Sequence, residues 1–129
     1  MRSLVTLVVV VLSSVVAHGQ STVSNENKAM IYVTQLIYIV PGQEKVFDQF
    51  EAVAIPLIAK YNGRLLLRVR PGDESYIEDH YGKPYEIHLV EFDSQQDFDN
   101  FKKDEERKKF LHLKEQSIKA SVMIQGTKL

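Results

Sequence analysis

The sequence contains no cysteine and no tryptophan, and it carries almost no net charge. Without cysteine, the chain can form neither a disulfide nor a thiolate nucleophile. Its 16 lysines and arginines are balanced by 17 aspartates and glutamates, which leaves no cationic excess to neutralise nucleic-acid phosphates. The sequence also lacks a glycine-rich phosphate loop and a G-x-S-x-G nucleophile elbow. These absences exclude a disulfide scaffold and thiol chemistry, and they argue against a nucleic-acid partner.

The first 19 residues have the pattern of a secretory signal peptide. Arg2 precedes an apolar run over 4–12, and the small-residue site Ala17-His18-Gly19 follows it. This apolar stretch is shorter than the roughly 20 residues of a membrane span, although an uncleaved N-terminal anchor is the alternative. We expect a signal peptide over 1–19 and a flexible leader over 20–29. The mature protein would then be periplasmic or secreted by a bacterium, without membrane contact.

Residues 30–129 are predicted to form one domain in which a strand–helix–strand unit occurs twice. The predicted elements are 30–40, 44–61, 64–70, 85–92, 95–113 and 118–125. The strands are rich in β-branched and aromatic residues, and the helices carry apolar stripes at spacings of three and four. A charged run interrupts the stripe of the second helical segment, which fits either two short helices or one bent helix. With right-handed crossovers, this order predicts an α+β fold, the ferredoxin-like β-α-β-β-α-β sandwich with strands one and three central.

Local signals predict where the helices begin and end. Asn62 and Gly63 should stop the first helix, with Gly63 in the left-handed conformation. Pro56 lies inside that helix and should bend it. Asp93, followed three residues later by Gln96, resembles the capping box that would start the second helical segment.

Two helices can cover only one face of a four-stranded sheet. Alternation along 64–70 places Leu65, Leu67 and Val69 towards the helices and the arginines on the open face. Leu66 and Met123 would also lie on the open face and would make it partly apolar. Because monomers rarely expose a large apolar patch, we expect two copies to pack sheet against sheet and form a dimeric α/β barrel with a shared cavity.

Four stretches of the sequence resemble a known superfamily. They are 55–64, Leu67-Arg68, 90–94, and 104–113 running into a strand that ends at Gly126. The pattern resembles the dimeric α/β-barrel superfamily, which includes the antibiotic-biosynthesis monooxygenases. Within it, the pattern is similar to the small bacterial proteins called domain of unknown function 1330. The resemblance implies a homodimer and, as one activity, a cofactor-independent oxygenase. The chain departs from that family at Val69-Arg70, where members tend to have two glycines, and it lacks the tryptophan that haem-degrading relatives commonly use.

Arg68 and Glu91 are the predicted ligand-binding residues. Strict alternation places both on the cavity face of neighbouring strands, where a guanidinium and a carboxylate can pair or can orient a bound molecule. The alternative interpretation is a structural ion pair at the dimer seam. We therefore expect a homodimer that binds a small polar or partly apolar molecule between its sheets, without a cofactor. A monooxygenase-like enzyme and a non-catalytic interaction module remain the alternatives.

Two other features could carry chemistry, but their patterns favour structural roles. Alternation places His88 on the helix side, opposite Glu91, where a hydrogen-bonded histidine is expected rather than a base, unless a β-bulge reverses it. The segment 71–84 is acidic, but its spacing does not match a calcium-binding loop, so we expect a solvated loop. Its possible metal ligands are Asp73, Glu74, Glu78, Asp79 and His80. No metal site is predicted, and no catalytic residue is assigned.

Overall fold

The structure, a computed structural model, describes residues 29–129. In chain order, the elements are β1 (Ile31–Ile39), α1 (Glu44–Lys60), β2 (Gly63–Val69), the 3-10 turn η2 (Asp73–Ser75), β3 (Glu86–Phe92), α2 (Gln95–Lys102), α3 (Glu105–Lys109), α4 (Leu111–Ser117) and β4 (Ile118–Gly126). The predicted signal peptide over 1–19 and the leader up to residue 28 lie outside the described residues. No helix within 29–129 is long and apolar enough to cross a bilayer.

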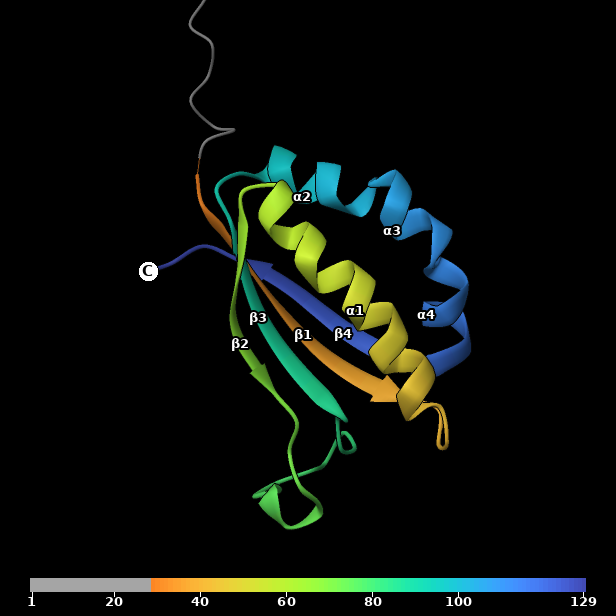
Figure 1. Ribbon diagram of the computed structural model, residues 1–129. Helices are drawn as coiled ribbons and strands as arrows, with labels where there is room; N and C mark the ends of the chain where they lie inside the picture. Colours follow the sequence, from red (N-terminus) through yellow and green to blue (C-terminus); the bar gives the residue numbers. More distant parts are fainter. Residues whose placement is uncertain (1–28) are drawn as a thin grey trace, which may run out of the picture.

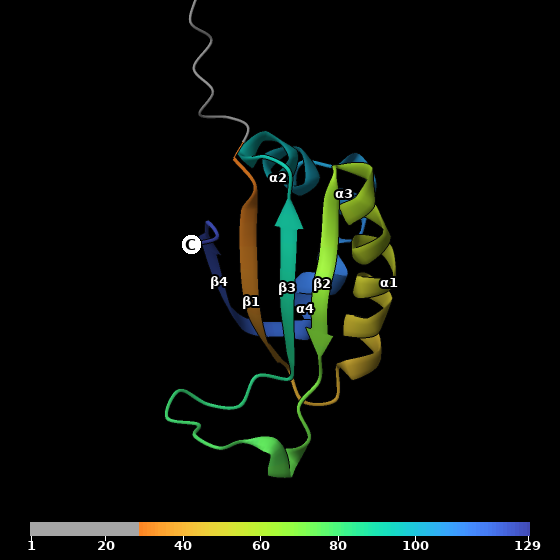
Figure 2. The ribbon, with the colours of Figure 1, turned by 90° about the vertical axis from the view of Figure 1, so that its left-hand side faces the viewer.

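The strands form one antiparallel sheet in the order β2-β3-β1-β4, and the four helices cover one of its faces (Figures 1 and 2). The order places β1 and β3 at the centre and confirms the predicted ferredoxin-like fold. Figure 2 looks onto the opposite face, which no helix of the described chain covers. The segment between β2 and β3 extends past the end of the sheet in both views.

The core lies between the sheet and the helices. Alternate residues of β3, from Glu86 to Phe92, are buried, as the period of two predicts. Phe92 is 1% exposed, and its ring centroid lies 5.3 Å from that of Phe98 and 5.5 Å from that of Phe101. Helix α1 contributes Phe47 and Phe50 from its buried stripe. These contacts hold the helices at a fixed distance above the sheet.

A register shift interrupts β2 at Leu66. Leu65 pairs with Val90 on β3, but Leu67 pairs with Leu89, so two residues of β2 advance against one of β3. This is a β-bulge, and one inserted residue moves every later side chain to the other face of the sheet. The prediction for 64–70 assumed unbroken alternation. It therefore assigns Arg64 and Leu65 to the correct faces of the sheet, but it assigns the residues after Leu66 to the wrong faces.

The bulge moves Arg68 to the helix side of the sheet. Arg68 pairs in register with His88 and hydrogen-bonds Glu86, both of which are buried beneath the helices. Leu67 and Val69 were predicted to face the helices, but both lie on the open face. Glu91 precedes the bulge in the pairing and keeps its predicted place on the open face, beside Arg64.

The open face is partly apolar, as predicted, but β4 contributes different residues. Ile124 pairs with Thr34 of β1 and lies on the open face, whereas Met123 pairs with Gln35 and lies on the helix side. The expectation that Met123 lies on the open face is thus wrong by one residue of register. The exposed apolar side chains of this face are Leu66, Leu67, Val69, Val122 and Ile124.

Two predicted boundary residues are each displaced by one position. Asn62, with φ of 55°, takes the left-handed conformation after α1 in place of Gly63. Ser94, rather than Asp93, caps α2, and its hydroxyl oxygen accepts a hydrogen bond from the Asp97 amide. Asparagine tolerates the left-handed region better than most residues, which explains the first difference.

The second helical segment is three short helices rather than one or two. Asp104 interrupts it because its carboxylate caps α3 at the Arg107 amide, 2.9 Å away. The same carboxylate accepts hydrogen bonds from Lys60 Nζ at 2.8 Å and Tyr61 Oη at 2.5 Å. These bonds, led by those from Lys60 and Tyr61, hold the pKa of Asp104 well below its ordinary value. Asp104 thereby ties the end of α1 to the start of α3.

Gly63 is required for close packing rather than for a turn. A Cβ at this position would lie 2.6 Å from Phe92 Cε1 and 2.7 Å from Ile58 Cγ2. We therefore expect Gly63→Ala to lower the free energy of unfolding by about 1–3 kcal/mol, as overpacking does. Denaturation in urea measures this, with Gly126→Ala as control because a Cβ there meets no atom within 4 Å. Equal stability of the two variants would contradict the packing argument.

Candidate functional site

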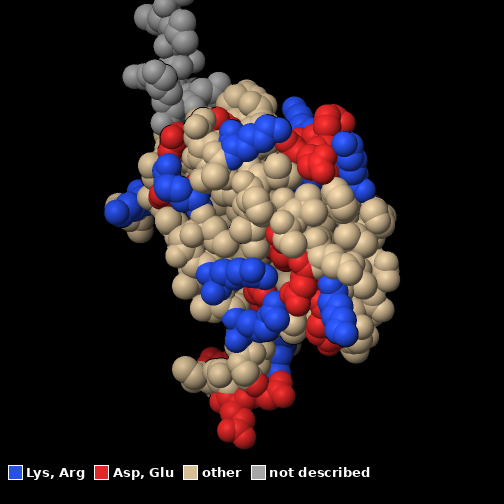
Figure 3. Space-filling model, viewed as in Figure 1, with Lys and Arg blue, Asp and Glu red and all other residues tan. Residues whose placement is uncertain are grey.

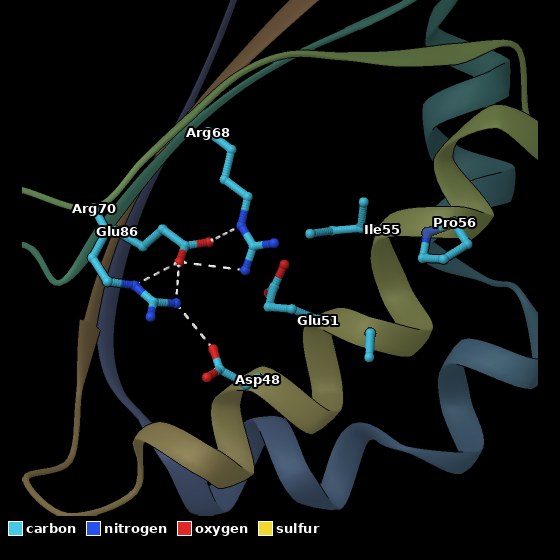
Figure 4. A pocket seen from close by; sticks show the side chains of 8 residues that line it. Asp48, Glu51, Ile55, Pro56, Arg68, Arg70 and Glu86 are labelled. Carbon is cyan, nitrogen blue, oxygen red and sulfur yellow. Dashed lines mark hydrogen bonds and ion pairs between the residues drawn. The ribbon is translucent and has the colours of Figure 1, made fainter.

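A pocket of about 620 Å³ lies between α1 and the strand β2 at the edge of the sheet. Figure 3 shows basic and acidic side chains next to each other on this side of the molecule, and Figure 4 shows the pocket from close by. We call it the arginine pocket. Its lining residues are Asp48, Glu51, Ala52, Ile55 and Pro56 from α1, together with Arg68, Arg70 and Glu86 from the sheet side.

Glu86 is the centre of the polar contacts in the arginine pocket. Its side chain is 1% exposed, and it accepts hydrogen bonds from Arg68 Nε at 2.6 Å and Arg70 Nη2 at 2.7 Å. His88 Nε2 lies 2.5 Å from Glu86 Oε1. Burial alone would raise the pKa of Glu86, but the hydrogen bonds from His88, Arg68 and Arg70 outweigh it and lower the pKa to about 2. The carboxylate is therefore ionised, and His88 Nε2 must carry the shared hydrogen.

Strand geometry explains why these side chains meet. Glu86 and His88 are two residues apart on β3 and therefore share the helix-side face. Arg68 reaches that face because of the bulge, and Arg70, two residues further on, follows it. Arg70 is also held by Asp48 of α1 at 2.9 Å and stacks on the Tyr85 ring, with its guanidinium carbon 4.3 Å from the ring centroid. The pocket thus joins α1, β2 and β3 through ionic contacts.

Glu51 brings a second buried carboxyl group to the pocket. It belongs to the buried stripe of α1, is 6% exposed, and extends towards Arg68 (Figure 4). Its Oε2 lies 4.0 Å from His88 Nε2, and within the described residues its carboxyl group makes no hydrogen bond. Burial raises the pKa of Glu51, and the Glu86 carboxylate adds to this, against the opposing effect of His88. Glu51 can therefore exchange a proton closer to neutral pH than an ordinary glutamate.

Glu51, Glu86 and His88 also form a group that could hold a metal ion. Their ligand atoms lie within 4.8 Å of one another, and all three residues are buried. However, both oxygens of Glu86 already accept hydrogen bonds from guanidinium groups. A divalent cation there would face two neighbouring positive charges, which repel it. The donor set fits a proton-exchanging group better than a metal centre.

The structure separates the two residues that were predicted to share a ligand. Arg68 lines the arginine pocket on the helix side, whereas Glu91 lies on the open face and forms an ion pair with Arg64. The predicted Arg68–Glu91 pairing is wrong because the bulge between them reverses the face of Arg68. A ligand-binding role for either residue remains a prediction, now at two different sites.

Glu91 lines a second hollow, on the open face. This hollow has a volume of about 600 Å³ and combines Tyr32, Thr34 and Glu91 with apolar residues of three strands. Arg64 forms ion pairs with Glu91 and with Asp93, 2.7 Å away, so the carboxylates of this region are already paired. We call it the open-face hollow.

His88 and the segment 71–84 have the structural roles that the sequence predicted for them. His88 lies on the helix side and is hydrogen-bonded, as predicted. In the segment 71–84, Glu78 and His80 are each 80% exposed, which fits a solvated loop.

Sequence reasoning missed Glu51, Arg70 and Glu86 as site residues. A usable signal was present, because Glu51 occurs within an apolar helical stripe and Glu86 alternates with core positions of β3. A charged residue at a core position usually has a buried partner.

Comparison with known proteins supports the fold. No protein-family model matches the sequence, and no curated protein matches it. A protein of unknown function from Rhodopseudomonas palustris matches with a TM-score of 0.68 and 12% identity, covering 81% of this chain and 86% of that chain. A dimeric protein of unknown function with a ferredoxin-like fold, from Bacteroides fragilis, matches with a TM-score of 0.60 and 12% identity, covering 79% and 99%. A NIPSNAP-like domain protein from Burkholderia xenovorans matches with a TM-score of 0.56 and 14% identity, covering 79% and 87%. The chain is therefore similar in fold to ferredoxin-like, dimeric α/β-barrel proteins.

The ionised form of Glu86 should stabilise the fold in a pH-dependent way. Because its pKa is lowered from 4.5 to about 2, this stabilisation is complete above about pH 4.5 and is lost as the pH falls towards 2. Glu86→Gln should lower the free energy of unfolding at pH 7 by about 1–3 kcal/mol. It should also flatten the dependence of that free energy on pH between 4.5 and 2.

Urea denaturation at several pH values measures both effects. Glu105→Gln is the matched control, because Glu105 is 84% exposed and pairs only with Lys108 of its own helix among the described residues. Asp104, whose pKa is also lowered, should retain part of the acid sensitivity in every variant. An acid profile of Glu86→Gln as steep as that of the unmodified protein would rule out the assigned ionisation.

Proposed function

We propose that this protein is an exported homodimer that binds a small, partly apolar molecule. The two open sheet faces would pack against each other, which leaves the arginine pocket of each subunit accessible on the helix side. The observation that carries the binding proposal is the pair of guanidinium groups with unused donors in the arginine pocket.

We also propose that the chain belongs with the domain of unknown function 1330 proteins, on the sequence stretches that resemble them.

The apolar open face supports the homodimer. Leu66 is 48% exposed and Ile124 is 58% exposed on a face with three further exposed apolar side chains. Monomeric proteins rarely leave a contiguous patch of this kind in water. A second copy is the occupant with matching shape, because a two-fold axis brings the same apolar surface onto itself. The dimeric Bacteroides fragilis protein with a similar fold is consistent with this arrangement.

The segment 71–84 extends the apolar surface beyond the sheet. Ile77 is 99% exposed and Tyr81 is 96% exposed, although both are residues that normally avoid such exposure. Together with Leu36, Tyr38 and Ile87, they line a groove of about 480 Å³ at this end of the sheet. In a homodimer, this segment would contact the second copy and enlarge the interface.

Unused hydrogen-bond donors favour ligand binding in the arginine pocket. Within residues 29–129, Arg68 and Arg70 each use Nε and Nη2 on carboxylates, and neither Nη1 takes part in a hydrogen bond. Their side chains are 39% and 41% exposed. Ala52, Ile55 and Pro56 form an apolar wall of the same pocket. A molecule with a carboxylate, phenolate or carbonyl oxygen and a small apolar body fits this combination.

The open-face hollow is a weaker candidate for the ligand site. Its carboxylate, Glu91, is already paired with Arg64, and two copies packing together would fill much of the space with apolar side chains. A ligand held between the sheets would therefore contact Tyr32, Thr34 and Glu91 rather than Arg68. This arrangement is the alternative location of the site.

One observation favours an enzyme as the second candidate function. A cofactor-independent oxygenase or a related enzyme needs a base beside its substrate, and the sequence offered none in a predicted cavity. Glu51 lines the arginine pocket with a pKa raised by burial, next to His88, so it could remove a proton from a bound phenol or an acidic C–H group. The third candidate, a non-catalytic interaction module, would retain the homodimer and bind no small molecule.

The homodimer should depend on the exposed apolar residues of β4. Ile124→Glu places a charge in the proposed interface, so the protein should change from dimer to monomer at micromolar concentration. Light scattering coupled to size exclusion measures this mass. Leu129→Glu is the control, because Leu129 is fully exposed in the C-terminal tail. A monomeric unmodified protein, without residues 1–19, would overturn the homodimer.

Benzoate is a suitable probe of the arginine pocket, since it combines a carboxylate with an apolar ring. We expect binding with an affinity at least tenfold lower in Arg68→Ala, measured by calorimetric titration and by NMR shifts of the Ile55 methyl groups. Arg68→Lys retains the positive charge but removes the free Nη1, so it should also weaken binding. Arg64→Ala, on the open face, should leave the affinity unchanged. If Arg64→Ala weakens binding as much as Arg68→Ala, or if the Ile55 signals do not move, the arginine pocket is not the site.

A further inference from the structure

A second cavity lies deeper in the molecule, between the sheet and the helices. We call it the inner cavity. It has a volume of about 60 Å³, and its walls include Val33, Phe50, Phe101 and Met123. Three ionisable side chains also line it, namely Glu51 from α1, Arg107 from α3 and Lys114 from α4. Glu51 and Ile55 line both this cavity and the arginine pocket, so they separate the two.

Arg107 is half-buried and lacks a full set of hydrogen-bond partners. Its Nε has no partner within the described part of the chain, and its Nη1 makes one long contact of 3.5 Å to the Lys102 carbonyl oxygen. The rings of Phe50 and Phe101 flank the guanidinium, with centroids 5.8 and 5.3 Å from its central carbon. Burial lowers the pKa of Arg107. An unpaired buried guanidinium donor is costly, since the group loses water and gains no acceptor.

Lys114 adds a second positive charge to the same cavity. Its ammonium group forms no hydrogen bond or ion pair among residues 29–129. Burial lowers the pKa of Lys114, and the nearby Arg107 lowers it further. Glu51 is the one carboxyl residue that lines the cavity, and it forms no ion pair with either cation among the described residues. Asp104 also favours the charged form of Arg107, but it lies outside the lining, and its carboxylate accepts hydrogen bonds from Lys60, Tyr61 and the Arg107 amide. Positive charge in the inner cavity therefore exceeds negative charge.

An anion in the inner cavity would remove this imbalance. Two half-buried cationic donors beside apolar side chains bind a negative charge more strongly than the same donors fully exposed at the surface. The remaining walls are aromatic and aliphatic, so they suit a ligand that is charged at one end and apolar at the other. An inorganic oxyanion would turn oxygen atoms towards Phe50 and Val33 and leave them unpaired. A short carboxylate meets both requirements.

We infer that the inner cavity is a binding site for a small aliphatic carboxylate, whose oxygens accept hydrogen bonds from Arg107 and Lys114. Its apolar end lies against Phe50, Phe101 and Val33. At about 60 Å³, the inner cavity has about a tenth of the volume of the arginine pocket, so it suits a smaller ligand. Acetate is the smallest carboxylate that also has an apolar end. The site is thus distinct from the arginine pocket in its residues and in the size of its ligand.

Acetate is the probe for this site, and acetamide is its uncharged counterpart of the same shape. We expect acetate to raise the melting temperature of the protein at constant ionic strength, and acetamide to have no such effect. Arg107→Met and Lys114→Met should each weaken acetate binding at least tenfold in a calorimetric titration. Lys108→Met is the control, because Lys108 is an exposed residue of α3 that pairs with Glu105.

A second measurement separates binding from folding. With ¹³C-labelled acetate, the methyl protons should show nuclear Overhauser effects to the ring protons of Phe50 and Phe101. Arg107→Met should be at least as stable as the unmodified protein when no anion is present, because it removes a half-buried charge whose buried Nε has no partner among the described residues. A purely structural Arg107 would make that variant less stable with or without acetate, which would overturn the inference.

Arg68→Ala keeps this inference distinct from the proposed function. Arg68 lines the arginine pocket but not the inner cavity, so Arg68→Ala should weaken benzoate binding and leave acetate binding unchanged. Arg107→Met should weaken acetate binding and leave benzoate binding unchanged. Equal stabilisation by acetate and acetamide, or an unchanged acetate affinity in Arg107→Met, would rule out the carboxylate site.

Discussion

A carboxylate that is 1% exposed must be neutralised where it lies, and the buried Glu86 imposes this constraint on the whole edge of the molecule. Arg68, Arg70 and His88 supply the required donors, and Asp48 then holds Arg70 against α1. These contacts to Glu86 and Asp48 hold the arginine side chains at the β2 edge of the sheet, where they line the arginine pocket. Without the bulge at Leu66, alternation would place both Arg68 and Arg70 on the other face, and Glu86 would lose both of its guanidinium partners.

The two faces of the sheet have different physical requirements. On the helix side, the core contains both apolar side chains and buried charges, so any charge that lacks a partner there is costly. On the open face, the charges are paired within the chain, and the uncovered surface is mostly apolar. In the proposed function, a second copy of the chain would cover the open face, and a small molecule with oxygen atoms would pair with the donors on the helix side. The two would use opposite faces of the sheet, so assembly and ligand binding would not compete.

Glu51 connects the arginine pocket with the inner cavity. Its carboxyl group is buried between Arg68 and His88 on one side and Arg107 and Lys114 on the other, and it lies within hydrogen-bonding distance of none of them. A carboxyl group in this position changes its proton affinity when a neighbouring charge changes. An anion in the inner cavity would thus raise the pKa of Glu51 further, so occupancy of one site would affect the chemistry of the other.

The sequence by itself determined the order of the elements, the ferredoxin-like fold, the central position of β1 and β3, and the helix side of His88. These properties follow from local periodicity, because apolar residues recur with a period of two in strands and 3.6 in helices. Only the tertiary structure decided the face of Arg68, the separation of Arg68 from Glu91, and the meeting of Glu51, Arg107 and Lys114 in one cavity. The bulge at Leu66 depends on how β2 pairs with β3, and the cavity depends on how three helices pack, so neither leaves a periodic signal in the sequence.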